Sequence, residues 1–311
     1  MSKRRVAAVD CGTNSLRLLV ADIDPDAGTL TDLDRRMEIV RLGQGVDRTG
    51  RLAPEALERT LAACRRYGEV IAALGATTVR VVATSATRDA DNRAEFVAGV
   101  RAVFGVDPEV VSGAVEAALS YGGATRELAA RPDIAAPYLV VDIGGGSTEL
   151  VRAADGRVAG VSVDVGSVRL TERHFADDPP TADQVAAATR DIDVALAGAG
   201  EAVPLDGVGT LVGLAGSVTT IGAVALGLPA YDPARVHHSR ISADRVHEIT
   251  ANLFRMNHDE RSAMGAIHPG RVDVIAAGSL VLDRIVVHTG ASEVLVSEHD
   301  ILDGIAWSLV E

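Results

Sequence analysis

The sequence predicts an α/β protein with two domains, each built on a mixed sheet flanked by helices. Apolar strand-like runs alternate with segments of helical period along the chain, which is typical of layered α/β folds. One short motif at the end of a predicted strand occurs twice. The length of 311 residues exceeds what one hydrophobic core ordinarily serves, so two domains are expected.

The repeated motif is VD-x-G-x-x-S, in VAAVDCGTNSLRLLV (6–20) and again in VDIGGGSTEL (141–150). Glycine costs backbone entropy, so it marks a sharp turn or a close approach to something else. One such turn is ordinarily a plain β-hairpin, but its repetition favours a function. Bare N–H groups and hydroxyls at such a turn cradle phosphate, and an Asp at the strand end can hold a hydrated divalent cation. The candidate phosphate ligands are Gly12, Thr13, Asn14 and Ser15 in the first copy and Gly144, Gly145, Gly146, Ser147 and Thr148 in the second.

In the first half, a helix is expected over Pro54 to Leu74, because Pro fits the first turn and Gly75 can close the last. The run VRVVA (79–83) predicts a buried strand that leads into TSATR (84–88). We expect Asp91 to cap a helix ending at Phe104, a strand at 108–112, and a helix beginning at Gly113.

The second half repeats this plan after the linker candidate RPDIAAP (131–137). We predict a hairpin at 138–152 and further elements in the order strand 158–165, helix 181–196, strand 210–214, helices 242–256 and 271–288, strand 293–297 and a final helix capped by Asp300. The predicted domains are 1–130 and 131–311, with the last helix, 300–311, packing on the first domain.

Composition narrows the class of protein. Hydrophobic residues make up 47% and aromatic residues 3%, which predicts a core of Val, Ala, Leu and Ile. No apolar run reaches membrane-spanning length and no signal peptide is visible, so we expect a cytoplasmic protein that does not bind membranes. The two cysteines, Cys11 and Cys64, imply neither a disulfide framework nor a metal site. The net charge of −13 disfavours nucleic-acid binding.

Seven stretches together resemble the exopolyphosphatase/guanosine pentaphosphate phosphohydrolase (Ppx/GppA) family. They are VDCGTNSLRLLV, TSATRDA, VSGAVEA, VDIGGGSTEL, DVGSVRLTE, VGLAGSVTT and RVDVIAAGSLVL. The resemblance implies the actin–sugar kinase–Hsp70 fold, with two RNase H-like domains and an active site in the interdomain cleft. The chain resembles the short, two-domain form of the family, for which a homodimer is one expected assembly.

The resemblance also implies roles for individual residues. Glu116 is the candidate general base, although Val115 stands where the family often has another glutamate. Asp142 is expected to bind Mg²⁺ or Mn²⁺, with Glu149 and Asp10 as further ligands. The remaining candidate phosphate ligands are Arg17, Arg88, Gly216 and Ser217.

Each of these residues also has a purely structural interpretation. A carboxylate near a helix start, as at Glu116, is stabilised by the helix dipole, and Asp10 and Asp142 can simply cap turns. Arg88 can form a surface ion pair, and the glycine at 216 can simply begin a helix. His237 and His238 are expected in a surface loop, and the adjacent Glu298, His299 and Asp300 are not expected to form a metal triad, because neighbours on a strand end point in different directions.

Four functions fit these features. The first is an Mg²⁺-dependent exopolyphosphatase that releases orthophosphate from inorganic polyphosphate, and the second is a guanosine pentaphosphate hydrolase with the same loops. The third, an ATP-dependent sugar or acetate kinase, requires an adenosine pocket and an Asp base, which the Ser-Gly-x-x-Glu-Ala setting of Glu116 disfavours. The fourth, a silent nucleotide sensor, is disfavoured by the intact set of Asp10, Glu116 and Asp142.

Overall fold

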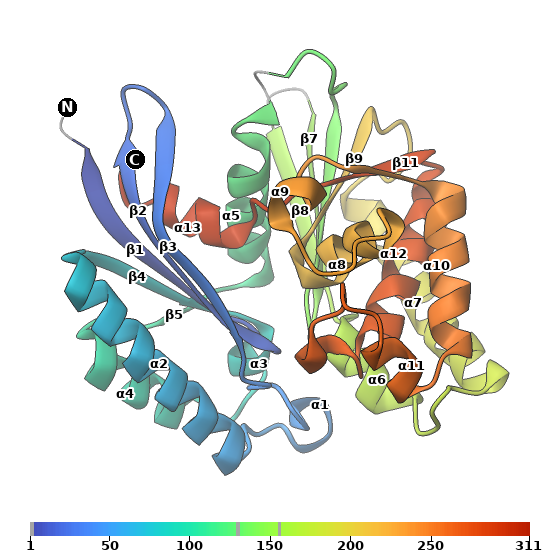
Figure 1. Cartoon of the computed structure of the whole chain (residues 1–311), viewed down its shortest axis with the longest axis horizontal. Helices are drawn as coiled ribbons and strands as arrows, with labels where there is room; N and C mark the ends of the chain where they lie inside the picture. The colour runs from blue at the N-terminus through green and yellow to red at the C-terminus, as the bar shows by residue number, and fades with distance from the viewer. Residues whose placement is uncertain (1–2, 129–130, 155–156) are drawn as a thin grey trace. The chain divides into compact units, whose positions relative to one another are not determined.

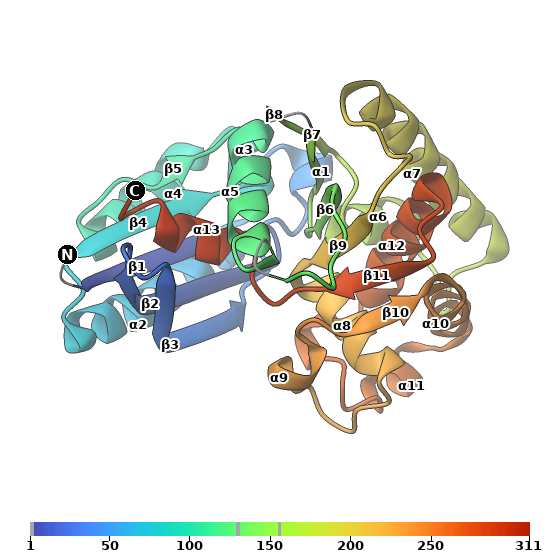
Figure 2. The same ribbon diagram turned by 90° about the horizontal axis from the view of Figure 1, so that it is seen from above.

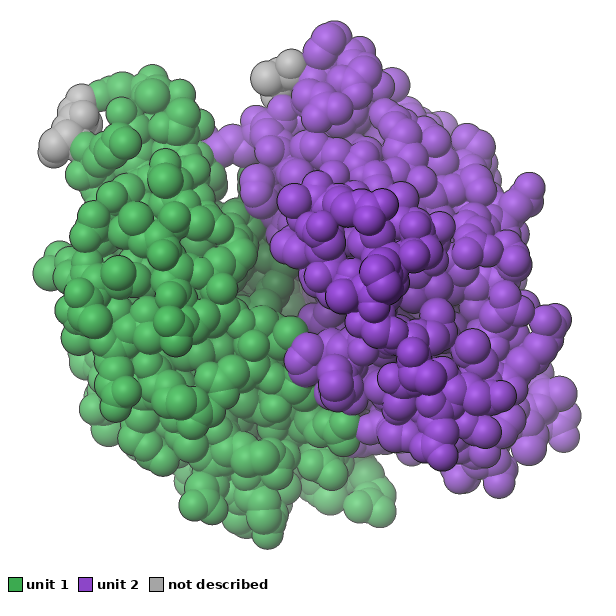
Figure 3. Space-filling view, in the orientation of Figure 1, with its two compact units in different colours: residues 1–123, 300–311 green, residues 124–299 purple. Residues whose placement is uncertain are grey.

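The computed structural model describes residues 3–128, 131–154 and 157–311. These residues form two compact units, shown in two colours in Figure 3. Unit 1 contains the chain up to Gly123 together with Asp300–Glu311, and unit 2 contains Ala124–His299. The predicted domain boundary, between residues 130 and 131, falls partly outside the described residues. The chain therefore passes from one unit to the other twice, once at the end of a helix and once just before the last helix.

Unit 1 is built on a mixed five-stranded sheet with the strand order β3-β2-β1-β4-β5 (Figure 1). Its strands are β1 (Arg4–Cys11), β2 (Ser15–Asp24), β3 (Thr29–Ile39), β4 (Thr78–Ala83) and β5 (Glu109–Val110). Its helices are α1 (Val46–Thr49), α2 (Pro54–Leu74), α3 (Ser85–Arg88), α4 (Arg93–Phe104), α5 (Gly113–Thr125) and α13 (Ile301–Trp307). The strands β1, β2 and β3 form an antiparallel meander, whereas β4 and β5 follow β1 in parallel.

The alternation of side chains along β1 explains how this sheet is covered on both faces. Ala7 and Val9 belong to the core that also contains residues of α2 and α4, whereas Val6 and Ala8 belong to the core formed with α13. A strand directs successive side chains to opposite faces, so an uninterrupted apolar run predicts a strand buried on both sides. The helix predicted over Pro54 to Leu74 is confirmed as α2.

The prediction that Asp91 caps the next helix is wrong. The helix α4 begins at Arg93 after Asn92, and no side chain caps it. The Asn92 side chain instead accepts a hydrogen bond from the Leu52 N–H at 2.8 Å and donates one to the Leu52 carbonyl at 3.1 Å. The Asn92 side chain therefore bonds to Leu52, a residue distant in sequence, and does not cap α4.

Unit 2 is built on a mixed six-stranded sheet with the strand order β10-β11-β9-β6-β7-β8 (Figure 2). Its strands are β6 (Tyr138–Ile143), β7 (Thr148–Ala154), β8 (Arg157–Val163), β9 (Thr210–Leu214), β10 (Arg240–Ser242) and β11 (Glu293–Val296). Its helices are α6 (Ser167–His174), α7 (Ala182–Ala202), α8 (Ala215–Ala225), α9 (Pro233–Val236), α10 (Ala243–Arg255), α11 (His258–Ser262) and α12 (Ile275–Thr289).

The two sheets share one topology. In unit 2 the strands β6, β7 and β8 form an antiparallel meander, and β9 and β11 follow β6 in parallel. The order β3-β2-β1-β4-β5 of unit 1 thus corresponds to β8-β7-β6-β9-β11 of unit 2. The predicted fold class, two mixed sheets flanked by helices, is confirmed.

The last helix, α13, packs within unit 1. Its residues Ile301, Ile305 and Trp307 are buried in the core that contains Val6 and Leu19. Asp300 caps the helix, as predicted, by accepting a hydrogen bond from the Leu302 N–H.

Both cysteines are free and buried. Within the part of the chain that the structure describes, no helix has both the length and the apolar character needed to cross a membrane.

Candidate active site

The first hairpin turn closes tightly between β1 and β2. The Gly12 N–H donates to the Ser15 carbonyl at 3.0 Å, and a Cβ atom at position 12 would lie only 3.2 Å from that oxygen. Two contacts brace the turn from outside. The hydroxyls of Thr13 and Ser85 lie 2.8 Å apart, and the Gly43 N–H donates to the Thr13 carbonyl at 2.8 Å. The segment that begins α3 is therefore held directly against the turn.

Asp10 and Arg17 lie opposite each other on β1 and β2 and form an ion pair. Arg17 Nε donates to Asp10 Oδ2 at 2.9 Å, and Arg17 Nη1 donates to Asp300 Oδ2. Burial raises the pKa of Asp10, the Arg17 charge opposes that shift, and Asp300 adds to it. The second carboxylate oxygen of Asp10, Oδ1, is buried and accepts no hydrogen bond from the described residues.

Glu116 and Arg88 contact each other. Arg88 Nη1 donates to Glu116 Oε2 at 3.0 Å and to the Val111 carbonyl at 3.2 Å. Glu116 lies in the first turn of α5 and is buried, whereas Arg88 ends α3. A guanidinium beside a carboxylate favours its ionised form, which is the form a general base needs.

The second hairpin turn repeats the backbone of the first. The Gly144 N–H donates to the Ser147 carbonyl at 3.0 Å. The turn is held by the segment that begins α6, because the Gly145 carbonyl accepts from the Arg169 N–H and the Gly146 carbonyl accepts from Arg169 Nε at 2.6 Å.

Gly166 explains how this segment approaches so closely. A Cβ atom at position 166 would lie 2.5 Å from the Gly145 carbonyl oxygen, a separation that real Cβ atoms essentially never show. Glycine at position 166 and glycine at positions 145 and 146 therefore allow the two backbones to lie this close together.

The carboxylates Asp142 and Glu149 are the cross-strand pair that corresponds to Asp10 and Arg17. Both are buried, at 6% and 1% exposure, and Ser162 Oγ donates to Glu149 Oε1 at 2.7 Å. Directly opposite residues share a face of the sheet with Cβ atoms about 4.5–5.5 Å apart, and like charges there repel. Two carboxylates so placed are a fit for Mg²⁺ or Mn²⁺, which bind oxygen ligands.

The junction of β9 and α8 is contacted by Arg271, a site candidate that the sequence did not reveal. Ala215 has a left-handed backbone (φ 64°), and a Cβ atom at Gly216 would lie 2.2 Å from Arg271 Nη2. Arg271 Nη1 donates to Thr220 Oγ1 at 3.3 Å, and no side chain caps α8. An arginine beside an uncapped helix start is suited to an anion. The signal that could have identified Arg271 was its place as the first residue of the stretch RVDVIAAGSLVL.

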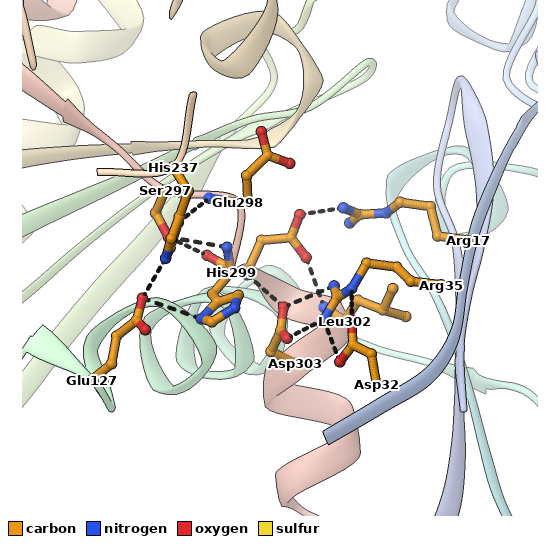
Figure 4. A network of polar contacts seen from close by, with 11 residues as sticks. Arg17, Asp32, Arg35, Glu127, His237, Ser297, Glu298, His299, Leu302 and Asp303 are labelled. Atoms are coloured by element: carbon orange, nitrogen blue, oxygen red, sulfur yellow. Dashed lines mark hydrogen bonds and ion pairs between the residues drawn. The ribbon is translucent and has the colours of Figure 1, made fainter. Parts of the chain in front are cut away.

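A separate cluster in unit 2 contains Glu127, His237 and His299, which bring three potential metal-ligand atoms within 4.8 Å of one another (Figure 4). Ring nitrogens of His237, His238 and His299 lie 3.0, 3.0 and 3.2 Å from Glu127 Oε1. However, the Glu298 N–H donates to His237 Nδ1 at 3.1 Å, and this places the proton of a neutral ring on the nitrogen that faces Glu127.

The chemistry of this cluster differs from that of the expected cofactor. Burial opposes ionisation of Glu127, but hydrogen bonds from the three histidines outweigh it and lower the pKa of that carboxyl. Nitrogen-rich groups suit zinc or copper rather than Mg²⁺. The Glu127 cluster brings potential metal ligands together, but its nitrogen atoms suit Mg²⁺ less well than the oxygen atoms of the pair Asp142–Glu149 do.

Two units of one topology, each with a glycine turn at the end of its first strand and charged side chains beside it, define a class of phosphate-binding α/β proteins. The chain belongs to the Ppx/GppA phosphatase family, which it matches over residues 19–311. It is 47% identical over 99% of both chains to Exopolyphosphatase 2 of Mycobacterium tuberculosis.

Solved structures agree. One described as an exopolyphosphatase-like protein is 41% identical and has a TM-score of 0.94, covering 99% of this chain and 98% of that one. The Aquifex aeolicus member of the Ppx/GppA family is 30% identical with a TM-score of 0.81, covering 99% and 98%. Both similarities span the two units rather than one of them.

Proposed function

We propose that this protein is an exopolyphosphatase that hydrolyses the terminal phosphoanhydride bond of inorganic polyphosphate and releases orthophosphate. The observation that carries this proposal is the buried pair Asp142–Glu149 beside the glycine turn 144–147. The similarity to Exopolyphosphatase 2 over 99% of both chains supports the same reaction.

In this proposal the second hairpin holds the metal ion, and its turn holds phosphate. Asp142 and Glu149 supply oxygen ligands, and a bound Mg²⁺ or Mn²⁺ neutralises charge on the phosphate oxygens. The Gly144 N–H closes the turn, and the residues Gly145 to Ser147 offer backbone N–H groups to the phosphate. Arg169 keeps the turn in place through its bond to the Gly146 carbonyl.

Glu116 is the proposed general base and accepts a proton from the attacking water. Its Oε2 atom accepts a hydrogen bond from Arg88, which holds the carboxylate at the end of α3. Arg88 and Arg17 are the proposed phosphate ligands of unit 1, since the guanidinium fork matches phosphate oxygens. Gly216, Ser217 and Arg271 are proposed to bind a further phosphate of the chain.

Guanosine pentaphosphate is the second candidate substrate, because its terminal phosphoanhydride requires the same groups. An orthophosphate-release assay with polyphosphate, guanosine pentaphosphate and ATP, each with Mg²⁺, with Mn²⁺ and with EDTA, separates the candidates. We expect metal-dependent release that is fastest from polyphosphate. Release only from guanosine pentaphosphate would assign the second function, and transfer of phosphate from ATP to a sugar or acetate would contradict both.

The proposed assembly is a homodimer and the proposed location is the cytoplasm. Light scattering coupled to size-exclusion chromatography tests the first of these.

A further inference from the structure

Arg17, a proposed phosphate ligand, is held between two carboxylates in unit 1. Its Nε and Nη2 atoms face Asp10 Oδ2 at 2.9 and 2.8 Å, and its Nη1 atom donates to Asp300 Oδ2. All three side chains are largely withdrawn from solvent, with 18%, 4% and 7% of their surfaces exposed. Charge pairs so placed are only partly screened by water and salt.

The position of Asp300 is fixed by contacts that do not involve Arg17. Its Oδ1 atom accepts from the Leu302 N–H at 2.9 Å as the cap of α13, and its own N–H donates to Asp303 Oδ2 at 3.0 Å. Its backbone lies against α5, since a Cβ atom at Gly123 would fall 1.9 Å from the Asp300 carbonyl oxygen. The carboxylate is therefore held in place whether or not Arg17 stays beside it.

The second carboxylate of the capping box has a different partner. Asp303 Oδ1 accepts a hydrogen bond from Arg35 Nη2 at 2.6 Å. Arg35 Nε also donates to Asp32 Oδ2 at 2.7 Å (Figure 4). Two carboxylates one helical turn apart thus neutralise two different arginines. Of these arginines, only Arg17 is adjacent to the first hairpin turn.

The charges of this group do not balance. Asp10 and Asp300 carry two negative charges when ionised and Arg17 carries one positive charge, so the group has a net charge of −1. A phosphate that approaches Arg17 must displace or share a guanidinium that Asp300 already holds. It also meets the surplus negative charge, which weakens its binding.

We propose that Asp300 sets the affinity for the substrate by competing with phosphate for the Arg17 guanidinium. This inference rests on the proposed function, because it requires Arg17 to bind substrate phosphate. Asp300 acts through Arg17 and does not touch the reacting atoms.

The variant Asp300→Asn tests the proposal, because Asn retains the helix-capping oxygen but loses both the charge and the oxygen that accepts from Arg17. We expect KM for polyphosphate to fall about threefold to tenfold, the effect of removing one partly screened charge beside a bound anion. The expected change in kcat is less than about twofold, since an interaction that affects only binding changes KM alone. Added salt should reduce the difference.

The matched control is Asp303→Asn, which removes the same charge from the same helix turn but leaves Arg17 with both carboxylates. We expect this variant to change KM by less than about twofold. Equal falls in KM for the two variants would overturn the proposal, because the effect would then be one of overall charge. The melting temperature of each variant shows whether the cap is retained.

A double-mutant cycle with Arg17→Gln identifies the route of the effect. In the Arg17→Gln background, we expect Asp300→Asn to lower KM much less than in the wild type, since the guanidinium for which it competes is absent and only the direct repulsion of phosphate is relieved. A fall in KM of the same size in both backgrounds would contradict the proposal, and so would a rise in KM for Asp300→Asn alone. Orthophosphate release by the wild-type protein tests the proposed function separately.

Discussion

The two glycine hairpins close with the same backbone hydrogen bond, but the residue paired with the Asp before the turn has opposite charge in the two. In each, a glycine N–H closes the turn on a serine carbonyl at 3.0 Å, and an Asp precedes the turn at the same register. The residue across from that Asp is Arg17 in unit 1 and Glu149 in unit 2. The first hairpin thus places an arginine opposite its Asp, whereas the second places a second carboxylate there, and carboxylate oxygens are ligands that Mg²⁺ prefers.

This difference extends to the neighbouring segments. The groups beside the first turn include the hydroxyl of Ser85 and the Arg88–Glu116 pair, which can bind an anion and move a proton. The groups beside the second turn include the backbone N–H groups of Ser167 and Val168 and the backbone and side chain of Arg169, which all donate to its carbonyls. In the proposed function, two copies of one fold therefore supply different groups to one reaction.

The largest effect is expected from Glu116→Gln, which removes the proposed proton acceptor of unit 1. We expect kcat for polyphosphate to fall by about 10² to 10⁴ with KM unchanged or lower. The control is Glu109→Gln, which breaks a more exposed ion pair with Arg80 (2.8 Å) and should leave kcat unchanged. Normal turnover with a lower melting temperature would show that Glu116 only stabilises its helix.

The next largest effect is expected from Asp142→Asn, which removes one of the two proposed metal ligands in unit 2. Activity at ordinary Mg²⁺ should fall by about 10² to 10³, and raised Mg²⁺ should restore part of it, because the metal supplies several kcal/mol of charge stabilisation. Asp10→Asn makes the same change in the first hairpin, where Arg17 neutralises the carboxylate. An equal shift in Mg²⁺ requirement for both variants would break the comparison.

The sequence predicted much of this arrangement, because the fold rests on local patterns. The apolar runs predicted β1 and β6, the helical period predicted α2, and the repeated motif predicted both turns. The strand β3 was not predicted, since TLTDLDRRMEI is polar and lies at the edge of its sheet. Edge strands need no continuous apolar run, so composition does not reveal them.

Contacts between distant residues were the part that the sequence did not reveal. The cluster around Glu127 joins residues from three separate segments of the chain. The approach of Arg271 to Gly216 likewise depends on the packing of α12 against α8. The roles of the candidate site residues stay predictions until variants are assayed.

A smaller effect, on stability, is expected from Gly123→Ala in unit 1. The added Cβ would collide with the Asp300 carbonyl oxygen, and overpacking of this kind costs about 1–3 kcal/mol of the free energy of unfolding. The neighbouring Gly122→Ala is the control, since nothing lies within 4 Å of its Cβ and Ala favours the helix. Thermal unfolding should show opposite shifts, and a lower melting temperature for both would contradict the account.

The smallest effect is expected from Gly216→Ala in unit 2. Its Cβ would displace the end of the Arg271 side chain, which can move without unfolding the protein, so KM should rise about threefold to tenfold. Gly198→Ala, on α7 with open space around it, should leave KM unchanged. If steady-state kinetics give the same KM for both variants, Arg271 does not contact the substrate.

The central claim is that the second hairpin, and not the first, binds the catalytic metal ion. Titration of Mn²⁺ followed by electron paramagnetic resonance measures that binding directly in the wild type, Glu149→Gln and Asp10→Asn. The account predicts that Glu149→Gln weakens Mn²⁺ binding by at least about tenfold, because an oxygen ligand loses its charge, whereas Asp10→Asn leaves it within about twofold. Unchanged Mn²⁺ affinity in Glu149→Gln, or an equal loss in Asp10→Asn, would contradict it.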